Sequence, residues 1–176
     1  MQKIRTVIAT LLFTIFSTSG IPCSEPKRGD GRDKDELIAK AEMIVLAEVV
    51  EIDPDVPYAT LFYLKPTRTL KGKPPERIEF MSVSPEYSSS DDFDGHTKEE
   101  FWTQDIGRSK WPCCICGPDH VFEPGETYLL FPDSFGAMKS AELIRSEDDK
   151  WLKYVETRIK EEHIQSSHTT PASAPR

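Results

Sequence analysis

The stretch MIVLAEVVEI, from Met43 to Ile52, decides the fold. It is rich in β-branched residues, which favour strands, and it is apolar on both of its alternating faces. A strand of this kind has to be covered on both sides, because both faces bury apolar surface. We therefore expect one face to line the interior of a small barrel and the other face to meet a helix.

The sequence after this stretch predicts further strands. Tyr58 to Leu70 alternates until Pro66, which has no amide donor and therefore indicates a sheet edge or a bulge. A strong turn follows, and Arg77 to Ser84 then alternates again. Glu126 to Phe131 is the next predicted strand, and Phe135 to Ile144 is expected to pair with it as a hairpin.

Helices are predicted on either side of these strands. Asp33 and Glu36 are spaced as a capping box, which predicts a short helix from about Lys34 to Glu42. Ser146 and Asp149 mark the start of a second helix, whose apolar face consists of Trp151, Leu152, Val155 and Ile159. The predicted fold is mainly β: an OB-fold-like small antiparallel barrel with a short N-terminal helix and a C-terminal amphipathic helix. A β-sandwich is the alternative.

Both ends of the chain are predicted to lie outside this domain. Lys3 and Arg5 precede a short apolar run, which predicts a signal peptide over residues 1–20 with cleavage after Gly20. Lipidation of Cys23 is disfavoured because Pro22 precedes it, where a small residue is usual. Residues 164–176 have the composition of a disordered tail, which leaves one domain over residues 21–163. We expect a secreted or periplasmic protein without stable membrane insertion.

The net charge and the missing catalytic motifs limit the function. The chain carries a formal charge of −8, and loss of the signal peptide with its two basic residues would make it −10. This charge disfavours nucleic acid as a partner. The sequence has no G-x-S-x-G elbow and no glycine-rich phosphate loop, and only His96 and His120 lie within the predicted barrel. We therefore expect no enzyme and no cofactor.

The four cysteines are Cys23, near the predicted mature N-terminus, and Cys113, Cys114 and Cys116, ahead of the last hairpin. In an exported protein an even number of cysteines predicts disulfides. Four cysteines can pair in three ways. A disulfide between Cys113 and Cys114 would join neighbouring residues and be strained, whereas one between Cys23 and Cys116 would close a long loop. The alternative is a zinc site formed by Cys113, Cys114, Cys116 and His120, although C-C-x-C is not the usual spacing of structural zinc ligands.

Several short motifs follow one another in a familiar order. An N-terminal cysteine is followed by AEMIVLAEVV at 41–50, RTLKG at 68–72, C-G-x(4)-F-x-x-G-E-T-Y-L-L-F at 116–131 and an amphipathic helix at 148–159. This arrangement resembles the netrin-like, or tissue inhibitor of metalloproteinases-like, domain over most of Cys23 to Glu162. The resemblance implies an OB-fold barrel, a disulfide between Cys23 and Cys116, and a module that binds another protein.

The resemblance also raises protease inhibition as an alternative function. In the metalloproteinase inhibitors of this family, the amino group and carbonyl of the N-terminal cysteine chelate the catalytic zinc. Cleavage after Gly20 would leave Ile21 and Pro22 ahead of Cys23, so a binding module is the favoured prediction. The irregular segment 85–118 is then expected to carry specificity. Its aromatic residues form a binding face or cover one end of the barrel: Phe93, Phe101, Trp102 and Trp111.

Overall fold

The computed structural model describes residues 33–57, 59–83, 94–103, 121–135, 137 and 139–168. The order of elements is α1 (Lys34–Lys40), β1 (Ile44–Asp53), β2 (Ala59–Lys71), β3 (Ile78–Val83), η2 (Gly95–Thr97), α2 (Glu100–Thr103), β4 (Thr127–Leu130), η3 (Pro132–Ser134), β5 (Ala141–Leu143) and α3 (Lys150–His168). None of the helices in these ranges combines the length and the apolar character needed to cross a membrane.

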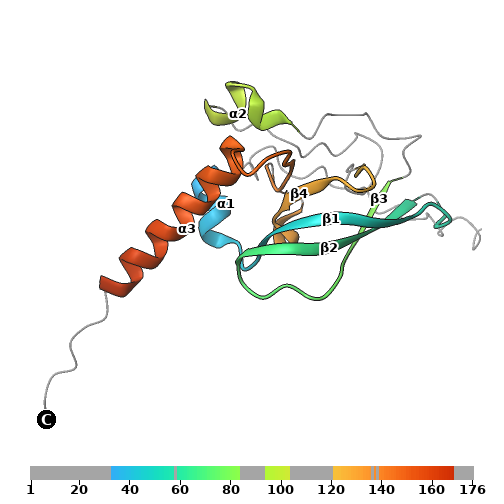
Figure 1. Cartoon of the computed structure of the whole chain (residues 1–176), viewed down its shortest axis with the longest axis horizontal. Helices are drawn as coiled ribbons and strands as arrows, with labels where there is room; N and C mark the ends of the chain where they lie inside the picture. The colour runs from blue at the N-terminus through green and yellow to red at the C-terminus, as the bar shows by residue number, and fades with distance from the viewer. Residues whose placement is uncertain are drawn as a thin grey trace, which may run out of the picture.

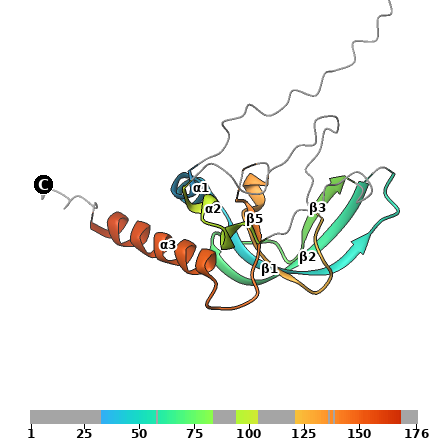
Figure 2. The same cartoon turned by 90° about the horizontal axis from the view of Figure 1, so that it is seen from above.

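The five strands form one antiparallel sheet in the order β3-β2-β1-β4-β5. The stretch Met43 to Ile52, predicted to be a strand covered on both faces, corresponds to β1. This strand lies in the middle of the sheet and pairs with β2 on one side and β4 on the other. Figure 1 shows β1 and β2 running together away from the helices, and Figure 2 shows the curvature of the sheet. The prediction of a small, mainly β antiparallel fold with helices at both ends is confirmed.

The inner face of the curved sheet encloses one core. Side chains from all five strands meet there, as they do in a barrel, and Phe122 lies among them. The Phe122 ring packs edge-on against Phe62 and Phe80, each at 5.4 Å between centroids, and against Tyr128 at 4.8 Å. β3 and β5 lie at opposite edges of the sheet and still contribute side chains to the same core, so the sheet has to curl.

The outer face of the sheet packs against the helices. Ile44 and Leu46 of β1 point to this side and join a second core with α1, α2 and α3. Trp151 of α3 is fully buried there, with its ring centroid 5.1 Å from that of Phe101. The prediction that one face of the central strand lines the interior and the other meets a helix is confirmed.

Pro66 lies at a bulge and also beyond the end of a neighbouring strand. It stands opposite Ala47, next to a shift in register between Leu46 and Ala47. The pairing of β2 with β3 ends at Leu64, so Pro66 lies in a part of β2 that β3 does not reach. Pro66 was predicted to mark a sheet edge or a bulge, and its position has both features.

The helix ends differ from the prediction in detail. α1 ends at Lys40, because Ala41 is already extended. α3 begins at Lys150, one residue after Asp149, and Ser146 forms a turn with Asp149 by accepting a hydrogen bond from its amide. The helix continues to His168, so residues 164–168 are helical although their composition predicts the start of a disordered tail.

Candidate functional site

Three titratable side chains meet in the interior of the described structure: His96, Glu142 and Asp149. The Nδ1 atom of His96 lies 2.8 Å from Oε2 of Glu142, and its Nε2 atom lies 2.8 Å from Oδ2 of Asp149. The side chains are 3%, 0% and 14% exposed, respectively. Because an ionised carboxylate only accepts hydrogen bonds, both ring nitrogens donate when the ring is an imidazolium. We call this arrangement the His96 clamp.

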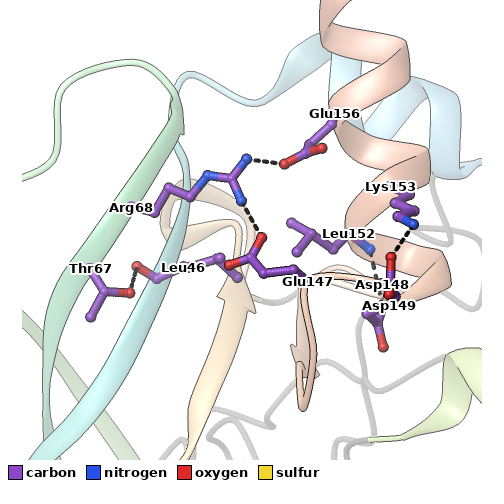
Figure 3. A network of polar contacts seen from close by, with 9 residues as sticks. All are labelled: Leu46, Thr67, Arg68, Glu147, Asp148, Asp149, Leu152, Lys153 and Glu156. Atoms are coloured by element: carbon purple, nitrogen blue, oxygen red, sulfur yellow. Dashed lines mark hydrogen bonds and ion pairs between the residues drawn. The ribbon is translucent and has the colours of Figure 1, made fainter.

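Each member of the clamp comes from a different element. His96 lies on η2, Glu142 is the middle residue of β5, and Asp149 precedes the first turn of α3. Asp149 has a second role, because its Oδ1 atom accepts hydrogen bonds from the amides of Trp151, at 2.8 Å, and Leu152, at 3.1 Å. Figure 3 shows Asp149 at this end of α3 with its contact to Leu152. One carboxylate therefore caps the helix and binds the histidine.

Aromatic side chains close the clamp on the side of α2. The Phe101 ring stands edge-on to His96 at 6.1 Å, and Nε1 of Trp102 donates a 2.9 Å hydrogen bond to the carbonyl of His96. Lys139 is also buried, with its Nζ atom 5.2 Å from the centre of the Phe101 ring. Phe101 is 1% exposed and belongs to the core between the outer face of the sheet and the helices, so its ring is part of the packing and not of an exposed binding face. Phe93 and Trp111 lie outside the described residues.

The two carboxylates control the protonation of His96. Burial lowers the pKa of His96, but the hydrogen bond and negative charge of Glu142, together with the charge and hydrogen bond of Asp149, raise it above the ordinary value of 6.5. The charged form is thus favoured by its neighbours despite the loss of solvent. A buried charge needs such partners, and here the histidine has two.

This geometry suits a structural clamp better than a catalytic base. A general base needs a ring nitrogen that can reach a substrate proton, whereas both nitrogens of His96 face carboxylates and the side chain is 3% exposed. What the arrangement does is fasten residues 94–103, which lie between β3 and β4, to β5 and α3.

A second polar link, on the molecular surface, joins β2 to the start of α3. Arg68 donates to Glu147 at 2.8 Å and also to Glu156, as Figure 3 shows. Thr67, beside it, donates to the carbonyl of Leu46 at 3.2 Å. All three side chains of the Arg68 link are partly or largely in solvent, so the link guides the position of α3 rather than providing chemistry.

The residues predicted as a disulfide or a zinc site lie outside the described ranges: Cys23, Cys113, Cys114, Cys116 and His120. The disulfide between Cys23 and Cys116 and the alternative zinc site therefore stay predictions. Within the part of the chain that the structure describes, no group of three histidine, cysteine, aspartate or glutamate side chains is arranged to hold a metal ion.

The sequence pointed to His96 but not to its partners. Glu142 and Asp149 follow it by 46 and 53 residues, and the chain has 30 acidic residues from which to choose. One signal was available: Glu142 stands between the apolar residues Ala141 and Leu143 in the last predicted strand. A carboxylate buried in such a strand requires a cationic or donor partner.

Comparison with known proteins adds no relative. No family model matches the chain, and no curated protein matches it. The function is therefore inferred from the residues and their arrangement.

Proposed function

We propose that this chain is an exported, non-enzymatic module of netrin-like type that binds another protein. The observation that carries the proposal is the His96 clamp, in which a buried histidine has both nitrogens bound to carboxylates. Such a group is poorly suited to proton transfer and well suited to holding a segment in place. Presentation of a fixed surface is what a binding module requires.

The clamp supports binding by reducing the freedom of residues 94–103. This segment is attached through His96 to β5 and α3, and through Phe101 to the outer core. Irregular segments carried on a rigid sheet are common sites of recognition. A segment that is already ordered loses less conformational entropy when a partner binds, so less of the interaction energy is spent on ordering.

Charge and expected processing narrow the class of partner. With a net charge of −8, the chain would repel nucleic acid and attract basic protein surfaces. Export after cleavage at Gly20 would place the cysteines in an oxidising compartment, where a disulfide between Cys23 and Cys116 would fix the N-terminal lead to the barrel. In this proposal the two cysteines have a structural role.

The proposal is tested on the full chain recovered after export. We expect N-terminal sequencing to begin at Ile21, mass mapping of disulfides to find the link from Cys23 to Cys116, and metal analysis to find no stoichiometric zinc. Chemical cross-linking in the native compartment should then yield a defined protein adduct. Zinc bound to free thiols would favour the metal site of Cys113, Cys114, Cys116 and His120, and a mature chain starting at Cys23 would favour protease inhibition.

A further inference from the structure

The end of the sheet that lies away from the helices exposes apolar side chains on its outer face. Val50 of β1 is 50% exposed and Met81 of β3 is 58% exposed. In Figures 1 and 2, this end of β1, β2 and β3 extends beyond α1 and α3, which pack against the other end. Single apolar residues at a surface are ordinary, whereas a continuous apolar patch marks an interaction site.

The strand register places them on one continuous surface. Asp53, Leu61 and Met81 are paired in one row across the three strands, and Glu51, Tyr63 and Glu79 form the adjacent row on the same face. The register shift between Val49 and Glu51 is a bulge, which gives Val50 an outward position beside Glu51. Leu61 and Tyr63 are half-buried and lie between Val50 and Met81.

Arg77 fixes the centre of this surface. Its guanidinium group lies 3.5 Å from the centre of the Tyr63 ring, and it pairs with Glu51 at 3.2 Å and Glu79 at 3.8 Å. The stack holds the tyrosine ring in one orientation, and the two carboxylates compensate the positive charge. Tyrosine, arginine and methionine are the residue types enriched in protein interfaces.

The rim of the surface is acidic. At this end of the face, beyond the rows that the helices cover, four carboxylates, from Glu48, Glu51, Asp53 and Glu79, stand against two basic groups, from Lys65 and Arg77, which leaves an excess of two negative charges. A second copy of the chain would bring the same negative rim against itself, and an anionic lipid surface would be repelled. Charge complementarity therefore selects a basic partner.

We propose that the face formed by Val50, Leu61, Tyr63, Arg77 and Met81 is the docking surface for a basic protein segment that inserts apolar side chains between its cationic ones. We call it the outer sheet face; it is the end of the sheet's outer face that the helices do not cover. This inference rests on the proposed function as a binding module and extends it, because it assigns a second contact surface, apart from the clamped residues 94–103, and the chemistry of the partner that fits it. Apolar contact with Met81 and Tyr63 would supply affinity, and the acidic rim would select the charge of the partner.

The first test uses synthetic peptides and calorimetry with the full exported chain. One peptide alternates lysine and leucine, a second alternates lysine and serine, and a third alternates glutamate and leucine. We expect the lysine and leucine peptide to bind on the order of 10-fold more tightly than either of the others, because only that peptide offers both features. Equal binding of the two lysine peptides would show attraction by net charge alone and would overturn the proposal.

Two matched substitutions make the test specific to the outer sheet face. Met81 and Ile164 are equally exposed, at 58%, and Ile164 lies on α3, away from that face. Met81→Asp and Ile164→Asp each remove an apolar side chain and add one negative charge. We expect Met81→Asp to weaken binding of the lysine and leucine peptide at least about 10-fold despite the added charge, and Ile164→Asp to leave it unchanged or slightly tighter. The same effect for both variants would contradict the proposal.

A cross-linking experiment separates failure of this surface from failure of the proposed function. A photoreactive amino acid is placed at position 81 or at position 164 of the chain in its native compartment. We expect a discrete protein adduct from position 81 and none from position 164. An adduct from position 164 alone would mean that the chain binds protein through another surface. If neither position nor general chemical cross-linking gave an adduct, the binding function itself would be wrong.

Discussion

The backbone of Gly72 lies directly against the carbonyl group of Glu42. A β-carbon added at Gly72 would stand 2.2 Å from that oxygen, and the residue has a φ of +77°. The contact joins the end of β2 to the segment that links α1 to β1. Glycine is therefore required at this position both for its backbone conformation and for the missing side chain.

Gly72→Ala is expected to destabilise the fold by more than the conformational cost of a left-handed residue, which is about 1–2 kcal/mol. Gly125→Ala is the matched control, because Gly125 has the same φ of +77° but nothing within 4 Å of its added β-carbon. Urea unfolding of both variants measures the difference. Equal losses would mean that the backbone around Glu42 moves aside without cost.

The His96 clamp predicts a dependence of stability on pH. Because the folded-state pKa of His96 is raised, its contribution is fully present below the unfolded pKa of about 6.5 and is lost as pH rises through the folded value. We expect the stability difference between the natural chain and His96→Gln to shrink as pH increases from 5 to 9. Urea unfolding across this range measures it, and a difference that grows with pH would contradict the charged clamp.

Asp149 allows the helix cap to be separated from the clamp. Asp149→Asn keeps a side-chain oxygen for the amides of Trp151 and Leu152 but removes the charge opposite His96. We expect this variant to lower the pKa of His96, as measured by NMR titration. Asp149→Ala should lose about 1 kcal/mol more than Asp149→Asn, because it also loses the cap. If the histidine pKa is the same in both variants and in the natural chain, Asp149 does not stabilise the imidazolium.

The Arg68 link is expected to contribute little to stability. Its partners Glu147 and Glu156 are 78% and 22% exposed, so solvent screens much of the attraction. Arg68→Met should lower the free energy of unfolding by no more than about 1 kcal/mol, and the loss should diminish in 1 M salt. Chemical denaturation at low and high salt measures both effects. A loss several times larger and insensitive to salt would indicate that the arginine acts by packing.

The first four strands and both end helices were predictable because their residues repeat with a clear period, whereas β5 covers only Ala141–Leu143 of the strand predicted over 135–144. β1 is apolar on both faces, and the structure places one face in each core. Pro66 has no amide donor, which predicted a break in strand pairing, and the break is observed. The apolar face of α3 was predicted from the spacing of its apolar residues between Trp151 and Ile159, which are buried. In each case the signal lies within one element, so local sequence is sufficient.

The clamp and the outer sheet face were not predictable in the same way. His96 finds its partners through the folding of β5 and α3, and no periodicity connects residues so far apart in sequence. The prominence of Val50 depends on a bulge that shifts the register after Val49, and the sequence carries no glycine or proline there to announce it. Contacts between elements that are distant in sequence cannot be predicted from the pattern within a single element.

The packing of α1 on α3 determines when the fold can be completed. Asp35 of α1 accepts hydrogen bonds from Tyr154 and Arg158 of α3, which follow it by 119 and 123 residues. During synthesis, α1 emerges early and has to wait for the last helix before its buried side can be covered. We infer that the buried side chains Leu37 and Ile38 of α1 stay uncovered until α3 has been made, and that folding is slow because the contacts that complete this core are so distant in sequence.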